Sequence, residues 1–402
     1  MGDDMKQQIQ LKVKPSFVKN LKAGYPLITE DTIQNVKVDA SEGSLIELVD
    51  ENNRFLARGY YGIQNKGRGW ILSRNQQEEF NATFFESKIQ KAMNHRSALY
   101  KDPQTTAFRV FNGEGDGIGG FTIDFFEGYY VISWYSEGIY QFKDLIIQAL
   151  EKLADFKGLY EKKRFASKGM YVDDNDFISG QEAPSPLLVK ENGMNFAVYL
   201  NDGAMVGIFL DQRDVRKKIR DSYSKGKTVL NTFSYTGAFS VAAALGGAMK
   251  TTSVDLANRS KSKTIEQFSV NAIDFEAQDI IVEDVFNYFK YAVRKELKFD
   301  LVILDPPSFA RSKKHTFSAG KDYPELLQQA IAITEKNGVI VASSNCSTFS
   351  MDKFKGFIEK AFKASKGKYK ILEEFSLPGD FKTLETFKEG NYLKVIFIEK
   401  LG

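Results

Sequence analysis

The stretch FDLVILDPPSFA, residues 299–310, decides the fold class of this chain. It begins as a nearly continuous apolar run, which is typical of a strand buried on both faces of a parallel sheet. The run ends at Asp305, and two prolines follow. Each proline fixes φ near about −65° and removes an amide donor, so the sequence predicts a rigid loop at the carboxyl end of a buried strand.

Six more strand-like runs occupy the second half of the chain: KTVLNTF (227–233), TTSVDL (251–256), DIIVED (279–284), GVIVASS (338–344), YKILEEF (369–375) and YLKVIFIE (392–399). Each of the first five runs along the chain, FDLVILD included, is followed by a helix-like segment. This alternation predicts an α/β fold with a doubly wound, mostly parallel sheet that helices cover on both faces. Ligands of such sheets bind beyond the carboxyl ends of the strands.

Two regions precede this sheet. Residues 9–75 hold short alternating runs broken by turns, which predict a small β-barrel. Residues 81–100 have helical spacing, and strands follow, with GEGDGIGG (113–120) as a tight hairpin turn. It lacks the Lys-Ser/Thr ending of a phosphate loop. We therefore expect a barrel over 1–76, a connecting helix and central α+β domain over 77–186, and the α/β domain over 187–402.

Composition bounds the class of protein. The chain has 402 residues, of which 43% are hydrophobic and 27% charged, as in a globular protein with a real core. One cysteine excludes an internal disulfide, and with only two histidines it cannot furnish an ordinary zinc site. The N-terminus has no apolar signal region, and no run approaches the length of a membrane span. We expect a cytoplasmic protein with no membrane contact and no metal.

The formal net charge is only +3, but basic residues are clustered. The clusters are Lys12, Lys14, Lys19 and Lys22; Arg213, Arg216, Lys217, Lys218 and Arg220; and Arg311, Lys313 and Lys314. Each one singly is interpreted as a solvated surface. Three of them in separate segments make nucleic acid a serious candidate partner.

The strand ends carry an ordered series of polar residues. Gly237 follows the first strand, Asp255 ends the second, and Asp284 follows the third. One glycine in place of G-x-G-x-x-G disfavours a dinucleotide, whose pyrophosphate needs close backbone approach. Acidic residues at two strand ends suit ribose hydroxyls and an adenine amino group, so the series favours S-adenosylmethionine over NAD. An aspartate after a strand can also be a helix N-cap.

The last two strand ends carry candidate chemistry. Asp305, held by Pro306 and Pro307, would present an acceptor to a flat heterocycle, with Phe309 available for stacking. The fifth strand ends at the only cysteine, Cys346. A lone cysteine is usually a small buried apolar residue. If the strand order is the usual one, however, Cys346 shares a crevice with Asp305.

These motifs together resemble a known family. FSYTGAFS, VDLANRS, VEDVF, LDPPSFARSKK and NCSTFS resemble the class I S-adenosylmethionine-dependent RNA methyltransferases. More narrowly, they resemble the cytosine-C5 methyltransferases of large-subunit (23S) ribosomal RNA that carry an N-terminal PUA domain. The match covers nearly the whole chain. It implies a seven-stranded Rossmann-like methyltransferase domain, a PUA-like domain at the start, and ribosomal RNA as partner; a homodimer is left open.

The resemblance also implies roles for individual residues. Cofactor-binding residues would be Phe233, Ser234, Tyr235, Gly237, Asp255, Asp284 and Gln212. Catalytic residues would be Cys346 and Asp305, and substrate-binding residues Pro306, Pro307, Phe309 and Arg311. The chain departs from the family at Met205-Val206-Gly207, where Lys-Thr-Gly is usual, and at Gly119, where proline is usual.

Two other functions stay open. One is methylation of guanine N7 or of an exocyclic amine, with Asp305 positioning the base and Cys346 incidental. The other is a non-catalytic RNA-binding or ribosome-assembly protein that retains the cofactor pocket.

Overall fold

A computed structural model describes residues 8–34, 40–64, 67–165, 176–203, 205–311 and 316–401; of Arg311 it describes only the backbone. Lys313, Lys314 and His315 lie outside the described residues. The chain forms two compact units. Unit 1 comprises Met1–Leu187, Tyr199–Val206 and Gly379–Gly390, and unit 2 comprises Leu188–Val198, Gly207–Pro378 and Asn391–Gly402. Among the described residues, no helix is long and apolar enough to cross a membrane.

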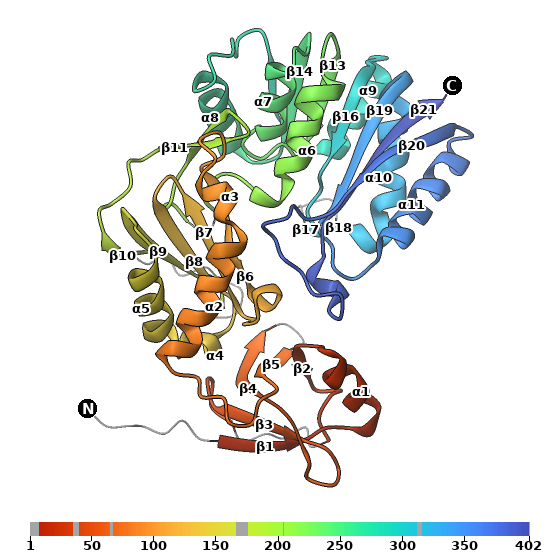
Figure 1. Cartoon of the computed structure of the whole chain (residues 1–402). Helices are drawn as coiled ribbons and strands as arrows, with labels where there is room; N and C mark the ends of the chain where they lie inside the picture. Colours follow the sequence, from red (N-terminus) through yellow and green to blue (C-terminus); the bar gives the residue numbers. More distant parts are fainter. Residues whose placement is uncertain are drawn as a thin grey trace. The chain divides into compact units, whose positions relative to one another are not determined.

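Unit 1 begins with a five-stranded sheet of order β1-β3-β4-β5-β2 (Figure 1). Its elements are β1 (Gln8–Lys12), α1 (Pro15–Ala23), β2 (Leu27–Thr29), β3 (Leu45–Val49), β4 (Phe55–Gln64) and β5 (Gly67–Ser73). The predicted strand-turn-strand is present as β3 and β4, joined by a turn in which Asn53 adopts a left-handed φ of 58°. Lys12, Lys19 and Lys22 of the first basic cluster are exposed.

The rest of unit 1 is built on a second five-stranded sheet, of order β10-β9-β8-β7-β6. Its elements are α2 (Ala82–His95), α3 (Ser97–Tyr100), β6 (Ala107–Asn112), β7 (Phe121–Phe126), β8 (Tyr129–Trp134), α4 (Glu137–Tyr140), α5 (Lys143–Leu153), β9 (Gly158–Lys163) and β10 (Phe177–Gly180). The predicted central α+β architecture is therefore present. Residues 113–120 join the antiparallel pair β6 and β7, but through a 3-10 turn, Gly113–Asp116, so the expected tight turn was wrong.

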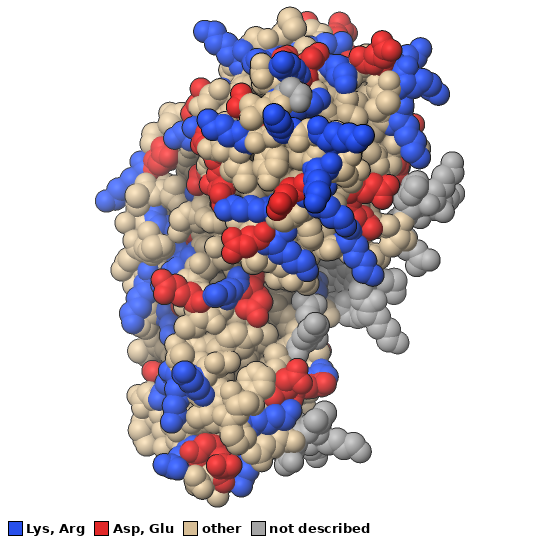
Figure 2. Space-filling view, turned by 90° about the vertical axis from the view of Figure 1, so that its right-hand side faces the viewer, with Lys and Arg blue, Asp and Glu red and all other residues tan. Residues whose placement is uncertain are grey.

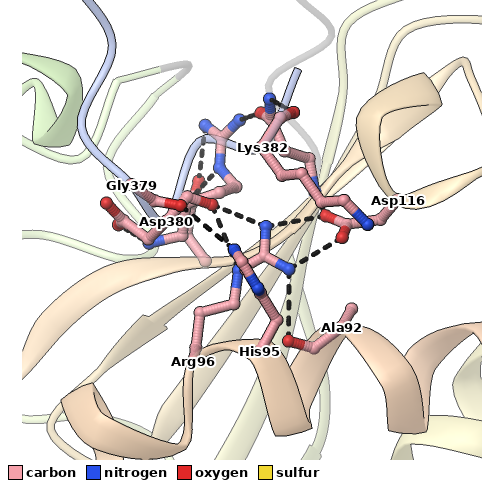
Figure 3. Close-up of polar contacts among 10 residues, drawn as sticks. Ala92, His95, Arg96, Asp116, Gly379, Asp380 and Lys382 are labelled. Carbon is pink, nitrogen blue, oxygen red and sulfur yellow. Dashed lines mark hydrogen bonds and ion pairs between the residues drawn. The ribbon is translucent and has the colours of Figure 1, made fainter. Parts of the chain in front are cut away.

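The glycine-rich segment holds a buried ionic cluster (Figure 3). Both Arg96 Nη atoms donate to the Asp116 carboxylate, at 2.8 and 2.7 Å. The same guanidinium donates to the carbonyl oxygens of Ala92 and Asp380. His95 Nε2 lies 3.3 Å from the Gly379 carbonyl oxygen. The cluster fixes the returning segment Gly379–Gly390 within unit 1.

Packing favours glycine at position 119, one of the departures noted from the sequence. A Cβ built on Gly119 would lie 2.2 Å from the Trp70 ring. The Gly119 carbonyl also accepts a hydrogen bond from the Tyr60 hydroxyl at 2.8 Å. A larger residue would therefore have to displace a buried tryptophan.

Unit 2 contains the predicted seven-stranded sheet, of order β15-β14-β13-β16-β19-β21-β20. The strands are β13 (Thr228–Thr232), β14 (Lys250–Asp255), β15 (Asp279–Val282), β16 (Phe299–Leu304), β19 (Thr334–Ser344), β20 (Lys368–Phe375) and β21 (Lys394–Leu401). The first five are parallel to one another, and β21 is antiparallel to both β19 and β20. This arrangement confirms the class I methyltransferase fold.

Helices cover both faces of this sheet (Figure 1). They are α6 (Arg213–Lys218), α7 (Ala238–Leu245), α8 (Asn258–Ser269), α9 (Val285–Arg294), α10 (Ala319–Ile333) and α11 (Met351–Ala364). The strands are apolar on both faces because alternate residues enter different cores. On β16, Leu301 and Ile303 pack with α6 and α7, while Val302 and Leu304 pack with α9, α10 and α11. Two hairpins, β11 (Leu187–Glu191) with β12 (Met194–Val198) and β17 (Phe309–Arg311) with β18 (Thr316–Ser318), complete the described strands.

The second basic cluster is only partly the solvated face that its sequence indicated: Lys217 is exposed, but two of the arginines are not. Arg213 and Arg216 are buried, and Arg216 donates to both carboxylate oxygens of Glu191 at 2.7 and 2.6 Å. Arg220 donates to the Asn192 carbonyl oxygen. A long side chain that begins on α6 can reach inward, and burial requires the charge to be paired. Elsewhere, Lys and Arg are interspersed with Asp and Glu over the face drawn in Figure 2.

Candidate active site

The loop after β13 has an unusual backbone. Phe233, Tyr235 and Gly237 all adopt left-handed φ, of 54°, 52° and 83°. Non-glycine residues rarely adopt this region, and such residues cluster at ligand-binding sites. Asp255, at the end of β14, holds the loop: the Tyr235 amide donates to its Oδ2 at 2.8 Å, and the Ala257 amide to its Oδ1 at 2.9 Å.

The backbone and packing at Gly237 both favour glycine. Its φ is positive, and a Cβ there would lie 2.6 Å from Thr264 Cγ2 on α8. The glycine therefore allows the loop to turn into α7 while α8 packs beside it.

Asp284 is both a helix cap and a residue of the cavity wall. Its Oδ1 accepts from the amides of Phe286 and Asn287, at 2.9 and 3.3 Å, and so caps α9. Its other carboxylate oxygen accepts no hydrogen bond from the described residues. The capping alternative that the sequence left open is correct, and it leaves one oxygen for a ligand donor.

These loops surround a cavity of about 390 Å³ at the carboxyl ends of the strands, within the size range of small-molecule sites. Nine of the predicted site residues line it: Gln212, Phe233, Ser234, Tyr235, Asp255, Asp284, Asp305, Pro306 and Pro307. Gly237, Phe309 and Cys346 are not in its lining, and the side chain of Arg311 is not described. Phe309 lies on β17 and is 63% exposed.

Several lining residues were missed from the sequence, among them Phe209, Leu256, Phe286 and Asn345. Phe209 is 41% exposed, and its ring centroid lies 5.4 Å from that of Tyr235. Leu256 directly follows Asp255, and Phe286 lies two residues after Asp284. Adjacency to an acidic strand end was therefore the signal that could have found these two.

The cavity fits S-adenosylmethionine. Asp255 and Asp284 supply acceptors at neighbouring strand ends, and Leu256, Val285 and Phe286 supply apolar wall. Gln212 Oε1 is buried and accepts no hydrogen bond from the described residues, so an ammonium or amide donor of a ligand would satisfy it. Among the described residues, no group of three or more His, Cys, Asp or Glu could hold a metal ion.

Asp305 lies in a hydrogen-bond network at the end of β16. Gln212 Nε2 and Ser343 Oγ both donate to its Oδ1, at 3.2 and 2.6 Å, and Gln212 Nε2 also donates to Ser343 Oγ at 2.9 Å. Burial raises the pKa of Asp305 to about 6; the Ser343 hydrogen bond opposes this shift and the Asp211 charge adds to it. Asp305 can therefore hold or release a proton near neutral pH.

Cys346 follows the neighbouring strand. β16 and β19 pair in parallel, with Leu304 opposite Ala342, so the two strand ends that carry Asp305 and Cys346 are adjacent. Cys346 is 9% exposed and packs within an apolar core, as expected for a lone cysteine that serves as a small apolar residue. Its Sγ also lies 3.1 Å from Thr348 Oγ1. The preceding residue, Asn345, lines the cavity.

Comparisons with known proteins identify the family. A PUA-like domain model matches residues 11–74, and an S-adenosylmethionine-dependent methyltransferase model matches residues 109–387. The Bacillus subtilis (strain 168) protein named "Putative ribosomal RNA large subunit methyltransferase YwbD" is 60% identical over 97% of this chain and 99% of its own length. "Ribosomal RNA large subunit methyltransferase I" of Klebsiella pneumoniae is 30% identical over 94% of each chain.

A solved structure agrees over almost the whole length. The crystal structure of SMU.776 complexed with SAH is 41% identical, with a TM-score of 0.90, and the match covers 98% of this chain and 100% of that one. S-adenosylmethionine is the cofactor of the family, in accord with the cavity described above. The chain therefore belongs to the S-adenosylmethionine-dependent methyltransferase family, in the branch that carries an N-terminal PUA-like domain and includes the large-subunit ribosomal RNA methyltransferases.

Proposed function

We propose that this protein methylates C5 of a cytosine in large-subunit (23S) ribosomal RNA, with Cys346 as the nucleophile. One observation carries the proposal: the only cysteine follows the strand adjacent to the one that Asp305 follows, and the residue before it, Asn345, lines the cavity. The names of the relatives and the PUA-like domain support ribosomal RNA as the substrate. An enzyme with this substrate would work in the cytoplasm, where ribosomes are assembled.

Cytosine C5 is a poor nucleophile and needs covalent activation. The Cys346 thiolate would add to C6, forming an Sγ–C6 bond while the C5=C6 electron pair shifts into an enamine that makes C5 nucleophilic. The bound cofactor would supply its sulfonium methyl group to C5 and would leave as the neutral thioether. Asp305 or a solvent molecule would then take the C5 proton, the electrons of that C–H bond would restore the C5=C6 bond, the Sγ–C6 bond would break, and Cys346 would leave as the thiolate.

Asp305 suits the stabilisation of this adduct. Addition at C6 places negative charge on N3 and O2 of the ring. A carboxyl group whose pKa is about 6 can donate a proton to N3, and its other oxygen can accept from the exocyclic amine. Gln212 and Ser343 hold Oδ1 in place, so they would fix the orientation of the group. Pro306 and Pro307 would form the wall against the base, with Phe309 and Arg311 as further base and phosphate contacts.

The remaining cavity residues would bind the cofactor. Asp255 would accept hydrogen bonds from the ribose hydroxyls, and the free oxygen of Asp284 would accept one from the adenine amine. Phe233, Ser234, Tyr235 and Gly237 form the loop around it, and Gln212 would accept from its amino group. The target cytosine has to leave its stack to reach this site, which costs a few kcal/mol, as an order of magnitude, in paired RNA.

The decisive experiment uses ribosomal RNA from a strain that lacks this gene, incubated with the protein and isotopically labelled S-adenosylmethionine. We expect labelled 5-methylcytidine in the digest, lost in Cys346→Ala and kept in Ser347→Ala, a matched control at an exposed neighbouring residue. RNA that contains 5-fluorocytidine should trap a covalent complex, because the fluorine cannot leave as a proton does. Labelled 7-methylguanosine or a methylated exocyclic amine would refute the proposal, and cofactor binding without methyl transfer would favour an assembly role.

A further inference from the structure

Lys394 is buried at the strand end that carries Cys346. It is the first residue of β21, and its backbone pairs with Ser344, two residues before Cys346. The residue is only 4% exposed. Its ammonium donates to the Tyr392 carbonyl oxygen at 2.7 Å and lies 5.2 Å from the Phe349 ring centroid.

A buried ammonium normally has a carboxylate partner. Lys162, the other lysine that is buried among the described residues, forms an ion pair with Asp176. Within the described part of the chain, no carboxylate pairs with Lys394. Burial lowers the pKa of Lys394, and the charge of Cys346 acts in the opposite direction. Cys346 lies two residues after Ser344, the residue that pairs with Lys394.

The other titratable groups considered near this strand end do not supply a positive charge. Tyr323, on α10, donates to the Ser343 carbonyl oxygen at 2.9 Å, and burial raises its pKa well above the ordinary value, so it is neutral at pH 7. Asp305 would bring a negative charge, which opposes a thiolate. The side chain that lies 3.1 Å from the sulfur, Thr348, is neutral.

We propose that the Lys394 ammonium is the counter-ion that keeps Cys346 as a thiolate. Lys394 is thus a positioning residue for the reaction proposed above, and the inference rests on that function. A positive charge beside a thiol favours its ionised form. A structural lysine, held by the Tyr392 carbonyl and the Phe349 ring alone, would have no such effect on the sulfur.

The test exploits the single cysteine of the chain, because alkylation by iodoacetamide then reports Cys346 alone. The rate is measured from pH 5.5 to 10 by intact mass for the wild type and for Lys394→Met, Lys394→Gln and Lys394→Arg. The thiolate absorbance at 240 nm, taken as the difference from Cys346→Ala, gives a second profile. Lys400→Met is the matched control, since Lys400 lies on the same strand and donates to the carbonyl oxygens of Ile331 and Thr334.

We expect both neutral variants to alkylate at least about tenfold more slowly at pH 7 and to need higher pH for half-maximal rate. Lys394→Arg and Lys400→Met should keep the wild-type profile. Unchanged profiles in folded Lys394→Met and Lys394→Gln would overturn the inference. Product analysis separates the two proposals: loss of 5-methylcytidine in Cys346→Ala upholds the function even if the alkylation profile does not respond to Lys394.

Discussion

Replacing Asp305 by asparagine should stabilise the protein at neutral pH while it abolishes methyl transfer. Burying the ionised carboxylate costs desolvation free energy, and a neutral asparagine does not have this cost. The amide oxygen of asparagine can still accept the hydrogen bonds from Gln212 and Ser343. The amide cannot donate a proton to the base in the way proposed for Asp305. Stability and activity are thus expected to move in opposite directions.

The magnitude follows from the pKa of Asp305. The folded protein binds this proton more tightly than the unfolded chain, because the pKa is raised from 3.8 to about 6. Wild-type stability therefore falls as the pH rises from about 4 to about 6, by about 3 kcal/mol in all, and asparagine does not titrate. The variant should gain about 3 kcal/mol above pH 7 and only about half of that at pH 5.

Urea unfolding at pH 5 and pH 8 measures this gain. Circular dichroism is the suitable signal, since Trp70 and Trp134 both lie in unit 1 and would not report unit 2. Asp284→Asn is the matched control, because asparagine caps a helix as well as aspartate does, and its stability should change little at either pH. An equal gain at both pH values, or a loss of stability, would refute the reasoning.

Three further predictions concern the supporting structure. Arg96→Met leaves Asp116 buried and unpaired, so it should cost roughly 3 to 5 kcal/mol in thermal unfolding of unit 1; a second change, Asp116→Leu, should restore most of it. Gly237→Ala forces a left-handed φ and a contact with Thr264, so it should cost about 1 to 3 kcal/mol in stability and weaken the binding of S-adenosylhomocysteine in calorimetry. Asp255→Asn can accept only one of the two loop amides, and its affinity for the same ligand should fall at least about tenfold, against no change in Ser347→Ala.

Local sequence was sufficient for the sheet and for its strand ends. Runs such as FDLVILD are apolar at consecutive positions because each strand packs against helices on both faces, and that pattern needs no knowledge of the partners. The rule that parallel strands present their carboxyl ends at one edge then brings Asp255, Asp284 and Asp305 to one cavity. The double proline could be placed there for the same reason, and the cysteine after the neighbouring strand, where the preceding residue, Asn345, lines the cavity.

Tertiary structure decided what the local pattern could not express. Arg213 and Arg216 appeared as surface charges, but Arg216 is buried because Glu191, 25 residues away, lies opposite it. The return of Gly379–Gly390 to unit 1 depends on the Arg96 guanidinium, which binds backbone carbonyls that carry no residue signature. In the sequence alone, nothing distinguishes Lys394 from an ordinary lysine at the start of a strand. Its burial beside Cys346 follows from the pairing of β21 with β19, and the environment of a charge is set by neighbours in space.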